Sequence, residues 1–188
     1  MIRIIGEDII DATYWTYKRI AYETDLGGEL RRESREIFDR GNAATILLYD
    51  RTRGTIVLTR QFRLPAFLNG GEEKLIETCA GVIENDDALD TILRETREET
   101  GFVIGAAKRI FECYMSPGSV TEKVVFFIAP YQADDRKENG GGMAEEGEFV
   151  EMLEVSFAEA LDMLARGEIK DAKTIILLQY AQIERLFD

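Results

Sequence analysis

The apolar positions of the chain repeat most regularly in the stretch that follows Gly81. There they recur every three or four residues, as on one face of a helix, at Ala88, Leu89, Ile92, Leu93 and Thr96. Asp86 or Asp87 suits the start of this helix, because an aspartate side chain accepts hydrogen bonds from the free amides. Gly101 suits its end, since glycine readily adopts the left-handed conformation found there. The pattern therefore predicts a helix from Asp86 or Asp87 to Gly101.

Shorter apolar runs and alternating patterns predict strands on both sides of this helix. The strands are expected at residues 2–10, 14–23, 29–38, 43–50, 55–63, 75–80, 109–115, 122–132 and 149–155. Residues 64–74 and 133–148 contain turn-forming residues and are expected to be loops. A helix over 156–166, which opens with a capping box, and a last amphipathic helix over 174–187 complete the pattern.

The first three strands lie within residues 1–42, a unit too small to bury a core of its own. We expect it to pack either on the main domain, residues 43–188, or on a partner chain. Its aromatic rings offer two interpretations, since such rings both fill cores and stack on nucleotide bases. They belong to Tyr14, Trp15, Tyr17 and Tyr22. We favour packing, and a homodimer that buries the unit is the predicted assembly.

The polar side of the predicted helix carries three neighbouring carboxylates. Glu95 and Glu99 are four residues apart and lie one above the other, with Glu98 beside them. Such carboxylates repel each other, whereas a divalent cation, which prefers oxygen ligands, would bind them. Arg94 is placed to hold Glu98 while Glu95 and Glu99 face a metal. The alternative is a hydrated acidic surface, but the whole pattern from Gly81 through the helix favours the metal site.

Other charged segments are candidate parts of a site. Arg60 and Arg63 end a predicted strand, where guanidinium groups either grip a phosphate or keep the surface soluble. Glu122 follows a Pro-Gly loop and either reaches a site or stands exposed at a strand end. The loop over residues 133–148 ends in acidic side chains that could close over a metal site as a lid. These side chains are Glu145, Glu146 and Glu148.

Composition narrows the chemistry. The 188 residues suffice for one domain with a full core, and the formal net charge of −13 argues against nucleic acid as a partner. The sequence holds no histidine, which excludes Ser-His-Asp and Cys-His catalysis and histidine-ligated zinc sites. Acid–base chemistry must therefore come from Asp, Glu, Lys or Tyr side chains.

The cysteines and the N-terminus indicate a compartment. Cys79 and Cys113 are far apart and flanked by apolar residues, so we expect both to be buried, reduced thiols, with a disulfide between them as the less favoured alternative. The first residues lack the pattern of a signal peptide, so we expect none there, and no apolar run is long enough for a membrane span. The expected location is cytoplasmic.

The region around the predicted helix resembles the Nudix box, the metal-binding motif of the Nudix hydrolase family. The matching residues are Gly81, Arg94, Glu95, Glu98, Glu99, Gly101 and Phe102. Asp87 replaces a glutamate, Thr96 replaces a bulky apolar residue, and the spacer before Arg94 has six residues instead of seven. The shortened spacer is similar to that of bacterial GDP-mannose pyrophosphatases within the ADP-ribose pyrophosphatase-like branch. Pro117, fifteen residues after Phe102, resembles a mark of that branch.

The resemblance extends over nearly the whole chain and implies a fold and a reaction. The fold is the Nudix α/β/α sandwich with a mixed sheet, and residues 1–42 are an N-terminal β extension similar to a swapped dimer arm. The implied reaction is Mg²⁺-dependent hydrolysis of a nucleoside diphosphate sugar, with Mn²⁺ as a substitute. GDP-mannose, giving GMP and mannose 1-phosphate, is the expected substrate. ADP-ribose is the alternative substrate, and a non-catalytic nucleotide-sugar sensor is the alternative of another class.

Position by position, the resemblance also implies roles for individual residues. The implied metal ligands are the Ala80 carbonyl, Glu95, Glu99 and Glu146. The implied catalytic carboxylates are Glu99, Glu122 and Glu146. Substrate contacts within one chain are Arg63, Ala80, Gly81, Val82, Glu122, Glu145 and Lys173. Those that reach in from the other subunit are Tyr14, Ser34, Arg35 and Glu36.

Overall fold

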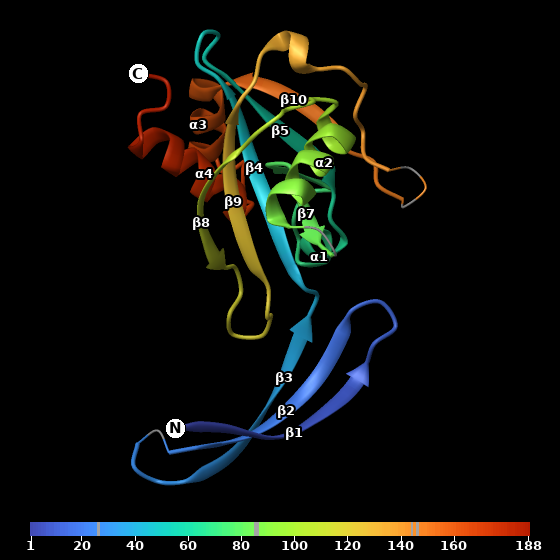
Figure 1. Ribbon diagram of the computed structural model, residues 1–188, viewed down its shortest axis with the longest axis vertical. Helices are drawn as coiled ribbons and strands as arrows, with labels where there is room; N and C mark the ends of the chain where they lie inside the picture. Colours follow the sequence, from blue (N-terminus) through green and yellow to red (C-terminus); the bar gives the residue numbers. More distant parts are fainter. Residues whose placement is uncertain (26, 85–86, 144, 146) are drawn as a thin grey trace. The chain divides into compact units, whose positions relative to one another are not determined.

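The computed structural model of the chain describes residues 1–25, 27–84, 87–143, 145 and 147–188 (Figure 1). In chain order its elements are β1 (Ile2–Asp11), β2 (Thr16–Thr24), β3 (Arg31–Asp39), β4 (Asn42–Asp50), β5 (Thr55–Phe62), α1 (Leu64–Leu68), β6 (Lys74–Glu77), β7 (Ala80–Ile83), α2 (Ala88–Thr100), β8 (Lys108–Tyr114), β9 (Lys123–Pro130), the short helical turn η1 (Ala133–Asp135), β10 (Glu151–Ser156), α3 (Phe157–Ala165) and α4 (Ala172–Ile183). They form two compact units, residues 1–42 with 113–124 and residues 43–112 with 125–188.

The smaller unit is built, in its described part, on a three-stranded antiparallel sheet in the order β1–β2–β3. Most side chains of β1 and β3 are exposed, as expected for a sheet with little core. The buried Glu23 carboxylate ties the sheet together through ion pairs with Arg3 and Arg32. β3 also pairs with the segment before β9, because the Phe38 amide donates to the Ser119 carbonyl at 2.8 Å.

The larger unit contains a sheet of seven strands among the described residues, in which β10, β5, β4, β9 and β8 are neighbours in that order. β4 and β5 pair next to their connecting turn, from Asp50 opposite Thr55 to Leu48 opposite Val57. Farther along, β6 pairs with β5 and β7 pairs with β4. These two short strands therefore occupy the split between β4 and β5, which brings the residues around Glu77 to the middle of the sheet.

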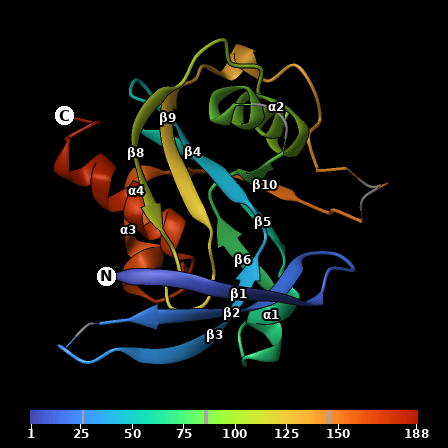
Figure 2. The ribbon, with the colours of Figure 1, turned by 60° about the horizontal axis from the view of Figure 1, so that its bottom comes forward.

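Helices cover both faces of this sheet (Figures 1 and 2). α2 packs on β7, β5 and β10 at one face, whereas α3 packs on β10 and on α4 at the other. Between α2 and the sheet lies an apolar cluster that includes the buried Ile46, Ile92, Phe102 and Phe127. This architecture confirms the α/β/α sandwich with an N-terminal β extension. No helix in the described part of the chain is long and apolar enough to cross a membrane.

The structure corrects two predictions in the segment between β5 and α2. The expected loop over residues 64–74 begins with α1, because the fixed backbone angle of Pro65 suits the first turn of a helix. The expected strand over residues 75–80 is two strands, since the chain leaves β5 after Glu77 and then joins β4 as β7. The apolar pattern is the same in both arrangements, so it does not reveal the change of partner.

Helix ends follow their capping residues. The Asp87 side chain accepts hydrogen bonds from two amides at the start of α2, and Gly101 adopts a left-handed φ of 78° at its end, as predicted. The last helix begins earlier than expected, because the Asp171 side chain accepts from the Thr174 amide and so caps α4 from outside.

The glycine-rich segment before β10 is anchored to α2. The Gly141 amide donates to the Glu99 carbonyl at 2.9 Å, and the Gly142 amide donates to the Glu98 carbonyl at 3.0 Å. A Cβ atom on Gly140 would come within 2.6 Å of the Glu99 carbonyl oxygen, so glycine is needed for this approach. The glycines thus satisfy carbonyls at the end of α2 and hold the start of the acidic segment there.

Candidate functional site

The carboxylates of α2 differ in burial and in pairing. Glu99 is 2% exposed, whereas Glu95 and Glu98 are half-buried. The Arg94 guanidinium pairs with Glu98 at 2.7 Å, as predicted. It also pairs at 2.9 Å with Glu95, which the prediction had left to face a metal. Within the described residues no hydrogen-bond donor reaches Oε2 of Glu99. Because buried polar atoms are normally paired, this oxygen is a candidate ligand atom.

Burial changes the acidity of two of these groups. It raises the pKa of Glu99 to about 8, and repulsion from Glu95 and Glu148 adds to the effect. Burial also raises the pKa of Glu95 to about 7, although the Arg94 guanidinium opposes it. Glu148 acts on both groups, which places this residue of the acidic loop near the α2 carboxylates. A divalent cation would replace repulsion by attraction and favour the ionised forms.

β7 runs directly beside Glu95. A Cβ atom on Gly81 would overlap the Glu95 carboxyl group, so a larger residue there would displace that side chain from its place between β7 and α2. Ala80 and Val82 flank it on β7, and all three residues are half-buried. The strand therefore brings main-chain polar groups next to a carboxylate, and oxygens of both kinds are ligands that hard cations prefer.

These features fit a divalent cation, although the described carboxylates do not by themselves form a complete site. Among residues 1–25, 27–84, 87–143, 145 and 147–188, no three Asp, Glu or Cys side chains are gathered so as to hold a metal ion. The fit rests on the free oxygen of Glu99 and on the approach of β7 to Glu95. Of the predicted lid residues, Glu146 lies outside the described residues and Glu145 is exposed.

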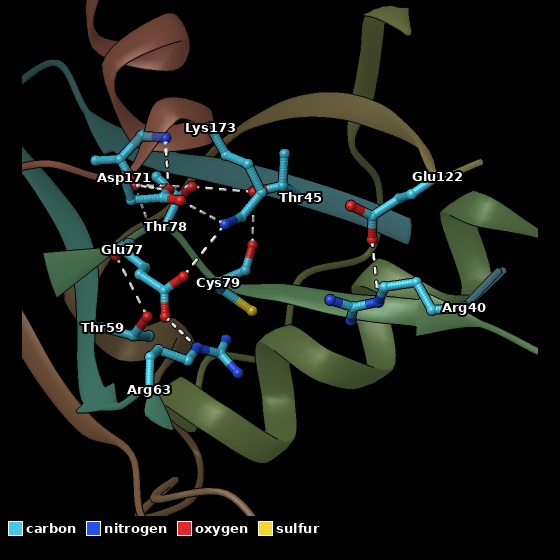
Figure 3. A network of polar contacts seen from close by, with 11 residues as sticks. Arg40, Thr45, Thr59, Arg63, Glu77, Thr78, Cys79, Glu122, Asp171 and Lys173 are labelled. Carbon is cyan, nitrogen blue, oxygen red and sulfur yellow. Dashed lines mark hydrogen bonds and ion pairs between the residues drawn. The ribbon is translucent and has the colours of Figure 1, made fainter. Parts of the chain in front are cut away.

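One carboxylate, that of Glu77, holds two predicted substrate-binding cations (Figure 3). Nε of Arg63 donates to its Oε2 at 2.7 Å, and Nζ of Lys173 donates to its Oε1 at 3.2 Å. Lys173 also pairs with Asp171 at 2.7 Å. Burial by itself would lower the pKa of Arg63 and of Lys173, but nearby carboxylates, Glu77 foremost, raise both. The structure thus brings Arg63 and Lys173 together from elements far apart in the sequence.

Sequence reasoning missed Glu77 and its surroundings. The available signal was one charged residue at the end of an apolar run, which is also typical of an exposed strand end. A tertiary contact next to Glu77 brings it to α4, because the Thr78 amide donates a hydrogen bond to Oγ1 of Thr174 at 2.7 Å. This bond ties the end of β6 to the first turn of α4, which carries Lys173.

Glu122 lies in the smaller unit, beside a cation that the sequence did not indicate. Nε of Arg40 lies 3.4 Å from Oε1 of Glu122 (Figure 3). The Arg40 guanidinium also stacks 5.5 Å from the centre of the Trp15 ring. The exposed Tyr14 ring packs with its edge on Trp15. Glu122 is therefore held at the start of β9 rather than free in solvent.

The remaining predicted contacts, Ser34, Arg35 and Glu36, are consecutive residues of β3 and are exposed. The Glu36 carboxylate accepts hydrogen bonds from Tyr17 and, at 2.7 Å, from Arg19 of β2. Their role as contacts to a substrate in another subunit stays a prediction.

Known proteins resemble this chain over its whole length. Residues 39–178 match the NUDIX domain. The chain is 48% identical over 189 residues to a GDP-mannose pyrophosphatase of Salmonella typhimurium, and the alignment covers 100% of this chain and 98% of that protein. It is 47% identical, with the same coverage, to a GDP-mannose pyrophosphatase of Escherichia coli O157:H7.

A solved structure shares the fold. The crystal structure of an ADP compounds hydrolase superposes with a TM-score of 0.74 over 97% of this chain and 95% of that one, at 16% sequence identity. At such low identity the likeness concerns the fold alone. Together with the domain match and the identity of nearly half the residues to full-length relatives, it shows that the chain belongs to the Nudix family of hydrolases, whose members generally use a divalent metal ion.

Proposed function

We propose that this Nudix hydrolase cleaves the diphosphate of a nucleoside diphosphate sugar, with GDP-mannose as its best substrate. The oxygen of a water molecule joins one phosphorus while the bridging P–O bond breaks, which gives GMP and mannose 1-phosphate. The observation that carries the proposal is the 47–48% identity with GDP-mannose pyrophosphatases along the full chain. The buried Glu99 and the half-buried Glu95 of α2 supply carboxylates of matching chemistry.

Mg²⁺, or Mn²⁺ in its place, would be held by the Ala80 carbonyl, Glu95, Glu99 and Glu146. Glu99 and Glu95 are supported by the Glu99 oxygen that has no hydrogen-bond partner among the described residues and by the close approach of Gly81 to Glu95. When bound, the metal would neutralise charge on the diphosphate and lower the pKa of a bound water molecule.

The chain's own residues bind the substrate and move the proton. Arg63 and Lys173 would contact the diphosphate, with Arg63 balancing charge on the departing phosphate. Further contacts would come from Gly81, Val82 and Glu145. A carboxylate, Glu122 or Glu146, would accept the proton of the attacking water, since the chain has no histidine.

The proposed assembly is a homodimer in which residues 1–42 of each chain complete the site of the other. The exposed apolar side chains of β1 support it, with Ile2, Ile4 and Ile9 exposed to 60%, 61% and 65%. The partner's contacts to the substrate would be Tyr14, Ser34, Arg35 and Glu36. We also propose a cytoplasmic location, because both cysteines are free thiols. Nucleic acid is not a proposed partner, because the net charge of −13 would repel its phosphates.

Side-by-side kinetics test this function. The protein is expected to release GMP from GDP-mannose with Mg²⁺, to lose that activity in a chelator, and to show a higher kcat/KM for GDP-mannose than for ADP-ribose. Glu99→Gln serves as the inactive control. An equal or reversed kcat/KM would assign the enzyme to ADP-ribose, and no monophosphate release from either substrate would favour a sensor.

A further inference from the structure

Glu77 is a buried carboxylate to which the proposed reaction assigns no role. Its side chain is 4% exposed, yet it carries ion pairs with both Arg63 and Lys173. Burying an ion pair costs desolvation energy, and an apolar side chain often fills such a position at no loss of stability. We infer that Glu77 is a positioning residue that orients Arg63 toward the substrate diphosphate and keeps Lys173 beside it, an inference that rests on the proposed function.

The geometry of Arg63 supports this role. Glu77 binds Arg63 through Nε at 2.7 Å, and the two terminal nitrogens of the guanidinium lie on the side away from Glu77 (Figure 3). The Arg63 side chain is 40% exposed, so these nitrogens are accessible to a ligand. A guanidinium fixed at one edge presents its remaining N–H groups in a plane that matches two oxygens of a phosphate.

The second oxygen of Glu77 places the other cation. Nζ of Lys173 lies 3.2 Å from Oε1, while Asp171, which caps α4, holds the same ammonium at 2.7 Å. Both cations lie within 3.2 Å of one carboxylate and would repel each other without it. Glu77 therefore keeps two positive groups, one after β5 and one on α4, close together before any substrate arrives.

The structure pairs Arg63 with Glu77, although Glu99 also acts on the charge of Arg63. Burial lowers the pKa of Arg63, whereas Glu77 and, after it, Glu99 raise it, so the guanidinium lies within the electrostatic reach of Glu99. An Arg63 released from Glu77 would be drawn toward Glu99, whose oxygens the proposed metal needs. Pairing of Arg63 with Glu77 would thus leave the oxygens of Glu99 available to the metal.

The test compares Glu77→Gln with a matched control, Glu154→Gln. Glu154 pairs with Arg53 and Tyr131 near the other end of β5, away from the proposed contacts. Two quantities are measured with Mg²⁺ present, kcat/KM for GDP-mannose and the affinity for inorganic pyrophosphate by calorimetry. Glu77→Gln is expected to lower each by at least about tenfold, the size of a lost hydrogen bond to a charged group, and Glu154→Gln to leave both unchanged.

A double-mutant cycle separates positioning from general stability. If Glu77 acts mainly through Arg63, adding Glu77→Gln to Arg63→Ala lowers pyrophosphate affinity by clearly less than Glu77→Gln does in the wild type, and the remaining loss is the part exerted through Lys173. A purely structural role would add the full loss in that background as well. Glu77→Asp is measured alongside, because it keeps the negative charge but shortens the side chain by one methylene. It is expected to fold even if Glu77→Gln does not, and to show the same weakening of pyrophosphate binding.

The outcomes distinguish this inference from the function on which it rests. A wild-type protein that binds pyrophosphate but does not hydrolyse GDP-mannose overturns the proposed function, and the binding comparison still decides the role of Glu77. Wild-type pyrophosphate affinity in Glu77→Gln or in folded Glu77→Asp overturns the inference. So does a full additional loss on top of Arg63→Ala, or a wild-type protein that binds no pyrophosphate.

Discussion

Replacing Glu99 by glutamine removes a buried titratable group while keeping the size of the side chain. In the unfolded chain the group has the ordinary glutamate pKa of 4.5, whereas burial raises its pKa to about 8 in the folded protein. The folded state therefore binds this proton more tightly than the unfolded state does. In metal-free protein, the free energy of unfolding should fall as pH rises from about 4.5 and level off above about 8. Glu99→Gln should lack this fall.

The size of the effect follows from the two pKa values. A tenfold difference in proton affinity corresponds to about 1.4 kcal/mol, so the ionisation of Glu99 costs the folded protein roughly 3 kcal/mol at pH 7. The cost is about 1 kcal/mol at pH 5 and roughly 4 to 5 kcal/mol at pH 9. Without metal, the free energy of unfolding of Glu99→Gln, relative to that of the wild type, should therefore increase by roughly 3 to 4 kcal/mol from pH 5 to pH 9.

Urea denaturation in a chelator, followed by fluorescence at several pH values, measures this difference. Glu73→Gln is the control, because Glu73 is exposed and its neutralisation should leave the curve unchanged. Adding Mg²⁺ should then stabilise the wild type at pH 8 and leave Glu99→Gln nearly unaffected, since a ligand stabilises only the state that binds it. A difference between wild type and Glu99→Gln that does not change with pH would refute the reasoning, as would equal stabilisation of both by Mg²⁺.

Three further predictions concern the loop, the assembly and the glycines. Glu146→Gln should lower kcat more than it raises KM, as expected for an interaction made mainly in the transition state; a larger loss in Glu148→Gln would move the catalytic role to that residue. Sedimentation at micromolar concentration should show a dimer, and a fully active monomer would remove both the dimer and the shared site. Gly167→Ala, at a φ of 75° in open space, should cost about 1 to 2 kcal/mol of stability in urea denaturation. Gly140→Ala, at a φ of 70° but against the main chain of α2, should cost clearly more, and equal losses would show that its close approach is unimportant.

Elements whose signals are local could be predicted from the sequence. α2 could be placed because its apolar period, its capping Asp87 and its terminal Gly101 all lie within one stretch of chain. The pairing of Arg94 with Glu98 followed from the same helical spacing. The resemblance of this stretch to the Nudix box then gave the fold, because the rest of the chain carries the strand pattern that the family requires.

Tertiary structure alone decided which side chains share the site and how they are charged. The partners of Glu77 come from the end of β5 and from α4, and no spacing along the chain reveals that they meet. The break after Glu77 arises because β6 and β7 take different neighbours in the split sheet. The raised pKa of Glu99 depends on its burial, which the packing of α2 on the sheet creates. Local periodicity specifies which face of an element turns inward, but the identity of the groups it meets there is set by contacts between distant segments.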